Sequence, residues 1–169
     1  MVISEVKKTE MEQAFHFVRK TFIDTYSIHN TPENMQIYLT QNLSEEQLSK
    51  EYDSPNCLFY KGIKNEQIAG YLKLNINDAQ TDKADLNAIE IERIYVDQSF
   101  HKMGFGAQLV SYSKEIGRNL SKSYLWLGVW NKNENVIGFY KKMGFETFDT
   151  HDFKLGDELQ TDFLMKLGL

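Results

Sequence analysis

The stretch from Ile89 to Ala107 reads Ile-Glu-Ile-Glu-Arg-Ile-Tyr-Val-Asp-Gln-Ser-Phe-His-Lys-Met-Gly-Phe-Gly-Ala. Its first half carries three isoleucines, a tyrosine and a valine, which predicts a strand that ends at Val96. A polar turn follows, and an amphipathic helix is expected to begin at Gly104 and Gly106. The first backbone N–H groups of a helix have no partner within the helix and lie at the positive end of its dipole. A strand, a glycine loop and a helix N-terminus in this order therefore predict an anion site.

Composition sets broad limits on the whole chain. Hydrophobic residues make up 41% and charged residues 25% of 169 residues, which predicts one globular domain over residues 1–169. The net charge of −5 argues against a nucleic-acid partner, because neutralising phosphates needs a basic surface. An acidic surface is better suited to a cationic partner.

Metal sites and membrane segments are not expected. Cys57 is the one cysteine, and the four histidines are scattered at His16, His29, His101 and His151. A zinc site would need several such residues at set spacings. The first eight residues lack the apolar core of a signal peptide, and the apolar run Leu125 to Trp130 is too short to span a bilayer. We expect a cytoplasmic protein with no metal and no membrane partner.

The N-terminal third is expected to contain one strand, over residues 2–7, and three helices. Each helix begins with a capping pattern: Thr9 with Glu12, Thr31 before Pro32, and Ser44 with Gln47. The third helix should end at Tyr52.

The rest of the chain is expected to be rich in strands. These are predicted over residues 57–63, 67–76, 88–96, 124–130, 145–150 and 161–167. One helix should run from Gly106 to near Asn119, and another over residues 134–143 with Gly144 just beyond its end. The Asp-rich segment 77–87 is expected to be a loop. This order predicts an α/β fold with a mixed, mostly antiparallel central sheet flanked by helices.

A second stretch, from Trp130 to Phe145, reads Trp-Asn-Lys-Asn-Glu-Asn-Val-Ile-Gly-Phe-Tyr-Lys-Lys-Met-Gly-Phe. The two stretches together resemble the acetyl-CoA motifs of the GNAT superfamily of N-acetyltransferases. In the first motif, His101-Lys-Met-Gly104-Phe-Gly106, histidine stands where the family has Gln or Arg. The second resembles Asn-x-x-Ala-x-x-Phe-Tyr-x-x-x-Gly-Phe, matched at Asn133, Val136, Phe139, Tyr140, Gly144 and Phe145. The resemblance implies the GNAT fold, acetyl-CoA as co-substrate and acetyl transfer to an amine.

The resemblance extends along nearly the whole chain towards one group within the superfamily. The chain is similar to PaiA-type bacterial polyamine acetyltransferases over residues 22–26, 32–35, 69–74, 78–81, 89–96, 126–130, 150–153 and 160–162. It implies direct transfer, in a ternary complex, to a primary amine such as that of spermidine or spermine.

Cofactor contacts are expected at two places. The pyrophosphate of acetyl-CoA should bind the loop and helix start formed by His101, Lys102, Met103, Gly104, Phe105, Gly106 and Ala107. The backbone of Ile94, Tyr95 and Val96 should pair with the pantetheine arm, and the family implies that an N–H there polarises the thioester carbonyl. Asn133 and Lys142 are further candidates for the arm and the phosphates.

Catalysis requires an acid for the leaving thiolate and a base for the amine, which is protonated at neutral pH. The family pattern implies Tyr140 as the acid, although a buried core aromatic is the simpler interpretation of that residue alone. Glu90 and Glu92 share one strand face and are base candidates, with an ion-paired or solvated face as the alternative. Substrate-side candidates are Tyr26, Asp78, Asp82 and Asp152.

Two alternatives to a polyamine acetyltransferase stay open at this level. The acceptor could be a protein N-terminus or a lysine side chain, since nothing in the sequence decides whether a peptide groove is present. The chain could also be an acyl-CoA-binding sensor without turnover. A homodimer is plausible, because two short C-terminal strands would leave an open sheet edge.

Overall fold

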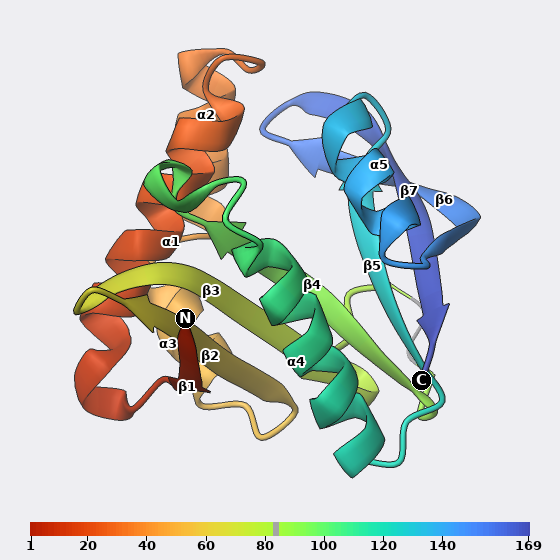
Figure 1. Ribbon diagram of the computed structural model, residues 1–169. Helices are drawn as coiled ribbons and strands as arrows, with labels where there is room; N and C mark the ends of the chain where they lie inside the picture. The colour runs from red at the N-terminus through yellow and green to blue at the C-terminus, as the bar shows by residue number, and fades with distance from the viewer. Residues whose placement is uncertain (83–84) are drawn as a thin grey trace.

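A seven-stranded mixed sheet forms the centre of the computed structural model, which describes residues 1–82 and 85–169 (Figure 1). The strand order is β1-β2-β3-β4-β5-β7-β6. The strands are β1 (Val2–Glu5), β2 (Cys57–Lys64), β3 (Gln67–Ile76), β4 (Ala88–Val96), β5 (Tyr124–Trp130), β6 (Glu146–Leu155) and β7 (Glu158–Gly168). All neighbours are antiparallel except β4 and β5, which are parallel. The predicted mixed, mostly antiparallel sheet is confirmed.

Helices cover both faces of this sheet (Figure 1). They are α1 (Met11–Tyr26), α2 (Pro32–Gln41), α3 (Glu45–Tyr52), α4 (Phe105–Asn119) and α5 (Glu134–Lys142), with short 3-10 turns η1 (Lys8–Glu10), η2 (Asn77–Ala79) and η3 (Gln98–Phe100). Successive residues of β3 point to opposite layers, so Tyr71 packs in the core under α1 whereas Leu72 packs in the core under α4. Within the described residues, no helix is both long and apolar enough to cross a membrane.

Two of the three predicted helix caps are present. The side chains of Thr31 and Ser44 accept hydrogen bonds from the backbone N–H groups of Asn34 and Gln47. The predicted Thr9–Glu12 box is wrong, because the chain first makes the turn η1 and α1 begins only at Met11. The Glu10 carboxylate accepts from the Lys7 N–H at 2.9 Å instead, which satisfies a backbone donor one turn earlier.

The C-terminal hairpin is longer than predicted. β6 runs to Leu155 and β7 begins at Glu158, so the pairing continues into residues 151–160, which lie between the two predicted strands. β6 is mostly exposed, and a solvent-facing strand needs no apolar alternation to hold its ladder. The tip of the hairpin is tied to α2, where Asn34 Oδ1 accepts from the Asp157 N–H at 3.0 Å.

The parallel step between β4 and β5 is short. Only Ala88 to Glu90 pair with Tyr124 to Trp126, and beyond these residues the two strands diverge (Figure 1). β4 therefore continues to Val96 with strand β3 on one side only. Divergence in the middle of the sheet leaves backbone groups of β4 free to pair with something other than a strand.

Candidate active site

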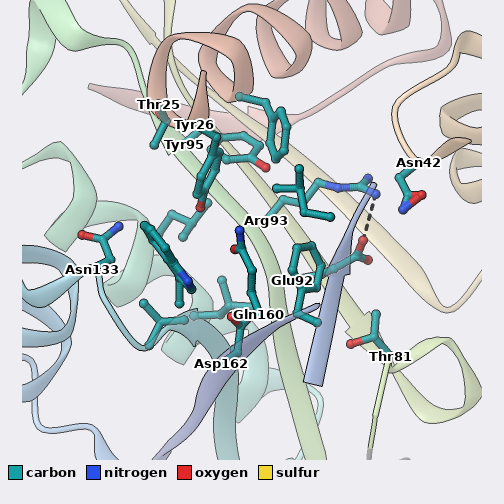
Figure 2. A pocket seen from close by; sticks show the side chains of 18 of the residues that line it. Thr25, Tyr26, Asn42, Thr81, Glu92, Arg93, Tyr95, Asn133, Gln160 and Asp162 are labelled. Carbon is teal, nitrogen blue, oxygen red and sulfur yellow. Dashed lines mark ion pairs between the residues drawn. The ribbon is translucent and has the colours of Figure 1, made fainter. Parts of the chain in front are cut away.

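A cavity of about 910 Å³ opens where β4 and β5 diverge. Its walls come from α1, α2, α3, β4, β5, α5 and the β6–β7 hairpin. Figure 2 shows Tyr26, Asn133 and Asp162 approaching it from three separate elements. The predicted site residues that line it are Tyr26, Asp82, Glu90, Glu92, Ile94, Tyr95, Val96, His101, Asn133, Tyr140 and Asp152.

The open edge of β4 presents the backbone of two residues to this cavity. The Asp97 N–H donates to the Ala69 carbonyl on β3, so Tyr95, two residues earlier, also faces β3. The backbones of Ile94 and Val96 alternate with it and face the gap. His101 Nε2–H donates to the Val96 carbonyl at 2.9 Å, which leaves the Ile94 groups and the Val96 N–H for an extended ligand with amides of its own.

The N-terminus of α4 is open to an anion. Gly104 caps this helix with φ +78°, a left-handed conformation that suits glycine. A Cβ built on Gly104 would meet nothing within 4 Å, so the space over the loop is free. The N–H groups of Phe105, Gly106 and Ala107 belong to the first turn, whose donors lack helical partners. These residues fit a pyrophosphate, with Lys102 and Met103 exposed beside them.

The helix α5 brings Tyr140 and Asn133 to the cavity but not Lys142. Tyr140 is 5% exposed, and burial raises the pKa of its hydroxyl well above the ordinary value. Asn133 caps α5, where its side-chain oxygen accepts from the Val136 N–H at 3.4 Å. Lys142 lies exposed at the far end of α5, outside the cavity lining.

Glu90 lies at the floor of the cavity and is 2% exposed. Its Oε2 atom accepts from Asn75 Nδ2 at 3.0 Å and from the Thr81 N–H at 2.8 Å, and Oε1 accepts from the Thr81 hydroxyl. Burial raises the pKa of Glu90 to about 7, with Glu92 adding to the rise and the bonds from Thr81 and Asn75 opposing it.

Glu92 belongs to a buried ion cluster of Glu51, Lys73, Glu92 and Arg93. Its carboxylate pairs with Lys73 Nζ and with Arg93 Nη2, the latter at 2.9 Å (Figure 2). Arg93 and Lys73 also pair with Glu51, at 2.5 Å and 2.7 Å. Burial alone would raise the pKa of Glu51, but Arg93 and Lys73 bring it down to about 2. Glu92 is therefore better placed to hold β3 against β4 than to accept a proton from an amine.

The predicted substrate-side residues divide between the cavity and the surface. Tyr26, Asp82 and Asp152 line the cavity. Asp78 lies outside it, exposed on η2, where its carboxylate accepts from Asn56 Nδ2 at 2.5 Å. A hydrogen bond to a neighbouring loop explains this aspartate without a substrate.

Several cavity residues were not predicted from the sequence as site residues, and two of them are ionisable groups that face each other. Asp162 on β7 and His151 on β6 are cross-strand partners, and both line the cavity. Burial raises the pKa of Asp162 to about 6, while the charge of His151 opposes the rise. Asp162 shares one face of β7 with Glu158, Gln160 and Lys166, so no local pattern in the sequence set it apart from solvent-facing residues.

The described part of the chain contains no candidate metal site. Over residues 1–82 and 85–169, no group of three or more His, Cys, Asp or Glu side chains is arranged to hold a metal ion.

Comparison with known proteins identifies the family. The sequence model of the acetyltransferase (GNAT) family matches residues 15–145. The chain belongs to the GNAT family. GNAT enzymes move an acetyl group from acetyl-CoA to an amine, and the open α4 N-terminus and β4 edge fit that co-substrate. The chain is thus an acetyl-CoA-dependent N-acetyltransferase.

Relatives and solved structures agree with this assignment. The chain is 43% identical over 167 residues, 99% of its length and 96% of the relative's, to an uncharacterised N-acetyltransferase from the pepI 3′ region of Lactobacillus delbrueckii subsp. lactis. A crystal structure of the PaiA N-acetyltransferase from Thermoplasma acidophilum with coenzyme A superposes with a TM-score of 0.79 at 20% identity, covering 99% of this chain and 98% of that one. The ribosomal-protein-S18-alanine N-acetyltransferase of Escherichia coli gives 0.72 at 18% identity, covering 99% and 92%. At these identities the two structures show the shared GNAT fold.

Proposed function

We propose that this enzyme acetylates a primary amine of a small polyamine, such as spermidine or spermine, by direct transfer in a ternary complex. The observation that carries the proposal is the cavity of about 910 Å³, which places carboxylates and Tyr140 beside the open edge of β4. A polyamine is a flexible chain of ammonium groups, and carboxylates in a cavity are the side chains that bind such groups. The sequence resemblance to PaiA-type polyamine acetyltransferases supports the same acceptor.

The shape of the cavity favours a small molecule over a folded protein. Gln160 Nε2 donates to Asn30 Oδ1 at 3.0 Å, and the Asp157 N–H donates to Asn34 at 3.0 Å. These bonds tie the β6–β7 hairpin, part of which lines the cavity, to the loop and helix that follow α1. A peptide acceptor would need an open groove at this place, whereas small ligands suit enclosed sites.

The residues of the cavity supply the proton transfers that the reaction needs. Tyr140 is proposed to donate its hydroxyl proton to the departing thiolate of coenzyme A. The acceptor ammonium must lose a proton before it can attack the thioester. Glu90 and Asp162 are the cavity carboxylates whose pKa values are raised towards neutrality, to about 7 and about 6. The N–H of Ile94 or Val96 would polarise the thioester carbonyl.

The acceptor is tested by measuring thiol release from acetyl-CoA against a panel of amines. The panel contains spermidine, spermine, diamines, amino acids and peptides with free N-termini or lysines. The proposal expects the highest kcat/KM with a polyamine. A rate with peptides alone would contradict the polyamine and favour a protein acceptor.

Tyr140 is tested by substituting phenylalanine, which keeps the ring and removes the proton. Turnover in Tyr140→Phe should fall by roughly 10²-fold or more, because acid catalysis at a leaving group contributes about that much. Calorimetric binding of acetyl-CoA should stay near the wild-type value, since the hydroxyl is needed only when the thiolate leaves. Unchanged turnover would exclude Tyr140 as the acid.

A cytoplasmic location and a homodimer remain predictions from the sequence.

A further inference from the structure

Asp162 is a cavity carboxylate that is itself largely buried, with 14% of its side chain exposed. Its Oδ1 atom is buried and has no hydrogen-bond partner among the described residues. Its Oδ2 atom lies 3.8 Å from His151 Nε2, beyond hydrogen-bond distance. Leaving a buried carboxylate oxygen unpaired costs free energy, so the arrangement is unfavourable unless a donor binds there.

Glu90 and Glu92 have fewer free hydrogen-bond acceptor positions for an incoming amine, because other groups of the protein already bind them. Glu90 receives three hydrogen bonds from Asn75 and Thr81, and two of them converge on Oε2. Glu92 is held between Lys73 and Arg93 and also accepts from Asn75 Nδ2 at 2.6 Å. A base must have a lone pair within reach of the proton that it takes, and the protein itself occupies most of those on the two glutamates.

The central strand leaves room in front of Asp162. Gly128 on β5 is exposed although both neighbouring residues, Leu127 and Val129, are buried, because the cavity opens over it. A Cβ at this position would lie 3.4 Å from Asp162 Oδ2 and 3.8 Å from His151 Nε2. Glycine therefore keeps a side chain of β5 from filling the space beside the carboxylate.

A second carboxylate holds the histidine that faces Asp162. Asp82 Oδ2 lies 3.0 Å from His151 Nδ1, so the ring is oriented with Nε2 towards Asp162. Asp82 and Asp162 thus approach His151 from opposite sides. This arrangement fixes the imidazole without using the free oxygen of Asp162.

We propose that Asp162 binds the reacting ammonium of the acceptor and takes its proton, with His151 and Asp82 as positioning residues. The proposal rests on the amine acetyltransferase function proposed above. One N–H bond of the ammonium breaks and the proton moves to the carboxylate of Asp162, leaving a neutral amine and a neutral carboxyl. The nitrogen lone pair forms the C–N bond to the thioester carbon, and the C–S bond breaks. The sulfur receives the Tyr140 proton, the product nitrogen returns a proton to the tyrosinate, and Asp162 releases its own to solvent.

The groups around Asp162 are compatible with this role. His151 faces it from β6, Tyr26 from α1, and Glu90 and Tyr140 line the same cavity from β4 and α5. The pKa of Asp162, about 6, leaves it mainly ionised at neutral pH, as a base must be. Asp162 also lies near Tyr26, whose pKa burial and the charge of Asp162 raise to about 12.

The test compares kcat/KM against pH, from 6 to 9.5, for wild type, Asp162→Asn and Asp162→Glu, with spermidine or the best amine of the panel. Wild type should be nearly flat above neutrality, because it binds the ammonium and removes its proton. Asp162→Asn should lose about 10²-fold to 10⁴-fold at pH 7 and then gain about tenfold per pH unit, since it depends on free neutral amine. Asp162→Glu keeps a carboxylate and should keep the flat profile at a lower rate.

Controls separate this role from a structural one. Asp157→Asn makes the same substitution at an exposed residue of the same hairpin, outside the cavity lining, and should match wild type at every pH. Acetyl-CoA binding by calorimetry should be unchanged in Asp162→Asn. An Asp162→Asn profile parallel to that of wild type would overturn the proposal for Asp162 alone. Wild type that releases no thiol with any amine would overturn the proposed function together with it.

Discussion

The negative charge of Glu92 stabilises the fold, because it pairs with Lys73 and Arg93 in the buried ion cluster that holds β3 against β4. Side-chain exposures of 3% for Lys73, 7% for Arg93 and 15% for Glu92 show that water cannot replace the lost partner. Glu92→Gln leaves two buried cations with one carboxylate, and breaking a buried pair costs about 3–5 kcal/mol. We expect a loss of that order in the free energy of unfolding, measured by urea denaturation.

The control for Glu92 is a surface pair. Asp53 lies 4.0 Å from Lys8, and the two side chains are 69% and 81% exposed. Asp53→Asn should leave the urea midpoint almost unchanged, because water and salt screen exposed pairs. An equally small effect for Glu92→Gln would show that the cluster does not support the sheet.

Glu90 predicts a pH dependence of stability with a definite sign. Its pKa of about 7 in the folded chain lies above the ordinary 4.5, so between these values the folded state binds more protons than the unfolded state. Stability from this group therefore falls as pH rises from about 4.5 to about 7, by on the order of 3 kcal/mol. Thermal melts at several pH values should show Glu90→Gln gaining stability relative to wild type over this window. A constant difference between the two proteins would contradict the raised pKa.

At the residue scale, the sequence predicted many of the cavity residues but not Asp162, whose buried Oδ1 atom has no hydrogen-bond partner among the described residues. Tyr140, Glu90 and the backbone of β4 were predicted, because family motifs and strand periodicity carry them. Asp162 was missed since its importance depends on where β7 passes β5, a long-range pairing that no local pattern contains. Asp78 was a substrate-side candidate in an Asp-rich stretch that also resembles PaiA-type enzymes, but in the structure its carboxylate accepts a hydrogen bond from Asn56 outside the cavity.

At the element scale, a substitution at Gly104, before α4, should affect both the stability of the protein and its binding of acetyl-CoA. Gly104→Ala places an L-residue at φ +78°, which costs about 1–2 kcal/mol, and its Cβ enters the space expected for the pyrophosphate. We expect a lower melting temperature and a clearly weaker calorimetric affinity for acetyl-CoA.

Gly138 provides the matched control within a helix. It lies inside α5, and a Cβ there also meets nothing within 4 Å. Gly138→Ala should stabilise α5 by up to about 1 kcal/mol through helix propensity and leave acetyl-CoA affinity unchanged. Equal weakening of acetyl-CoA binding in both variants would argue against a phosphate site at Gly104.

Elements with a strong local signal were predicted best. The strands β2 to β5 and the caps at Thr31 and Ser44 follow from periodicity and capping chemistry. The C-terminal hairpin was underestimated because β6 is a polar strand whose ladder depends on its partner β7. The turn η1 was missed because two capping patterns overlap in this segment. Thr9 with Glu12 was the predicted one, but in the structure the Glu10 carboxylate accepts from the Lys7 N–H.

At the scale of the whole molecule, the order of strands and helices was sufficient to predict the fold class. A chain with one parallel step among antiparallel neighbours has few ways to pack helices on both faces of a sheet. What the order did not contain is the distance over which β4 and β5 stay paired. The size of the cavity depends on that distance, since the ladder ends at Glu90 and Trp126.

Because β4 has an unpaired edge that can bind acetyl-CoA, the stability of the folded protein should depend on the acetyl-CoA concentration. A ligand that binds only the folded state adds a free energy set by mass action, about 2.7 kcal/mol at a concentration 100 times its dissociation constant. Hydrogen exchange should slow at the Ile94 and Val96 amides when acetyl-CoA is added and recover when it is dialysed away, whereas the Tyr95 amide, which faces β3, should change least. Equal protection at all three amides would contradict pairing along the gap. An enzyme built in this way is more resistant to unfolding and proteolysis when acetyl groups are plentiful.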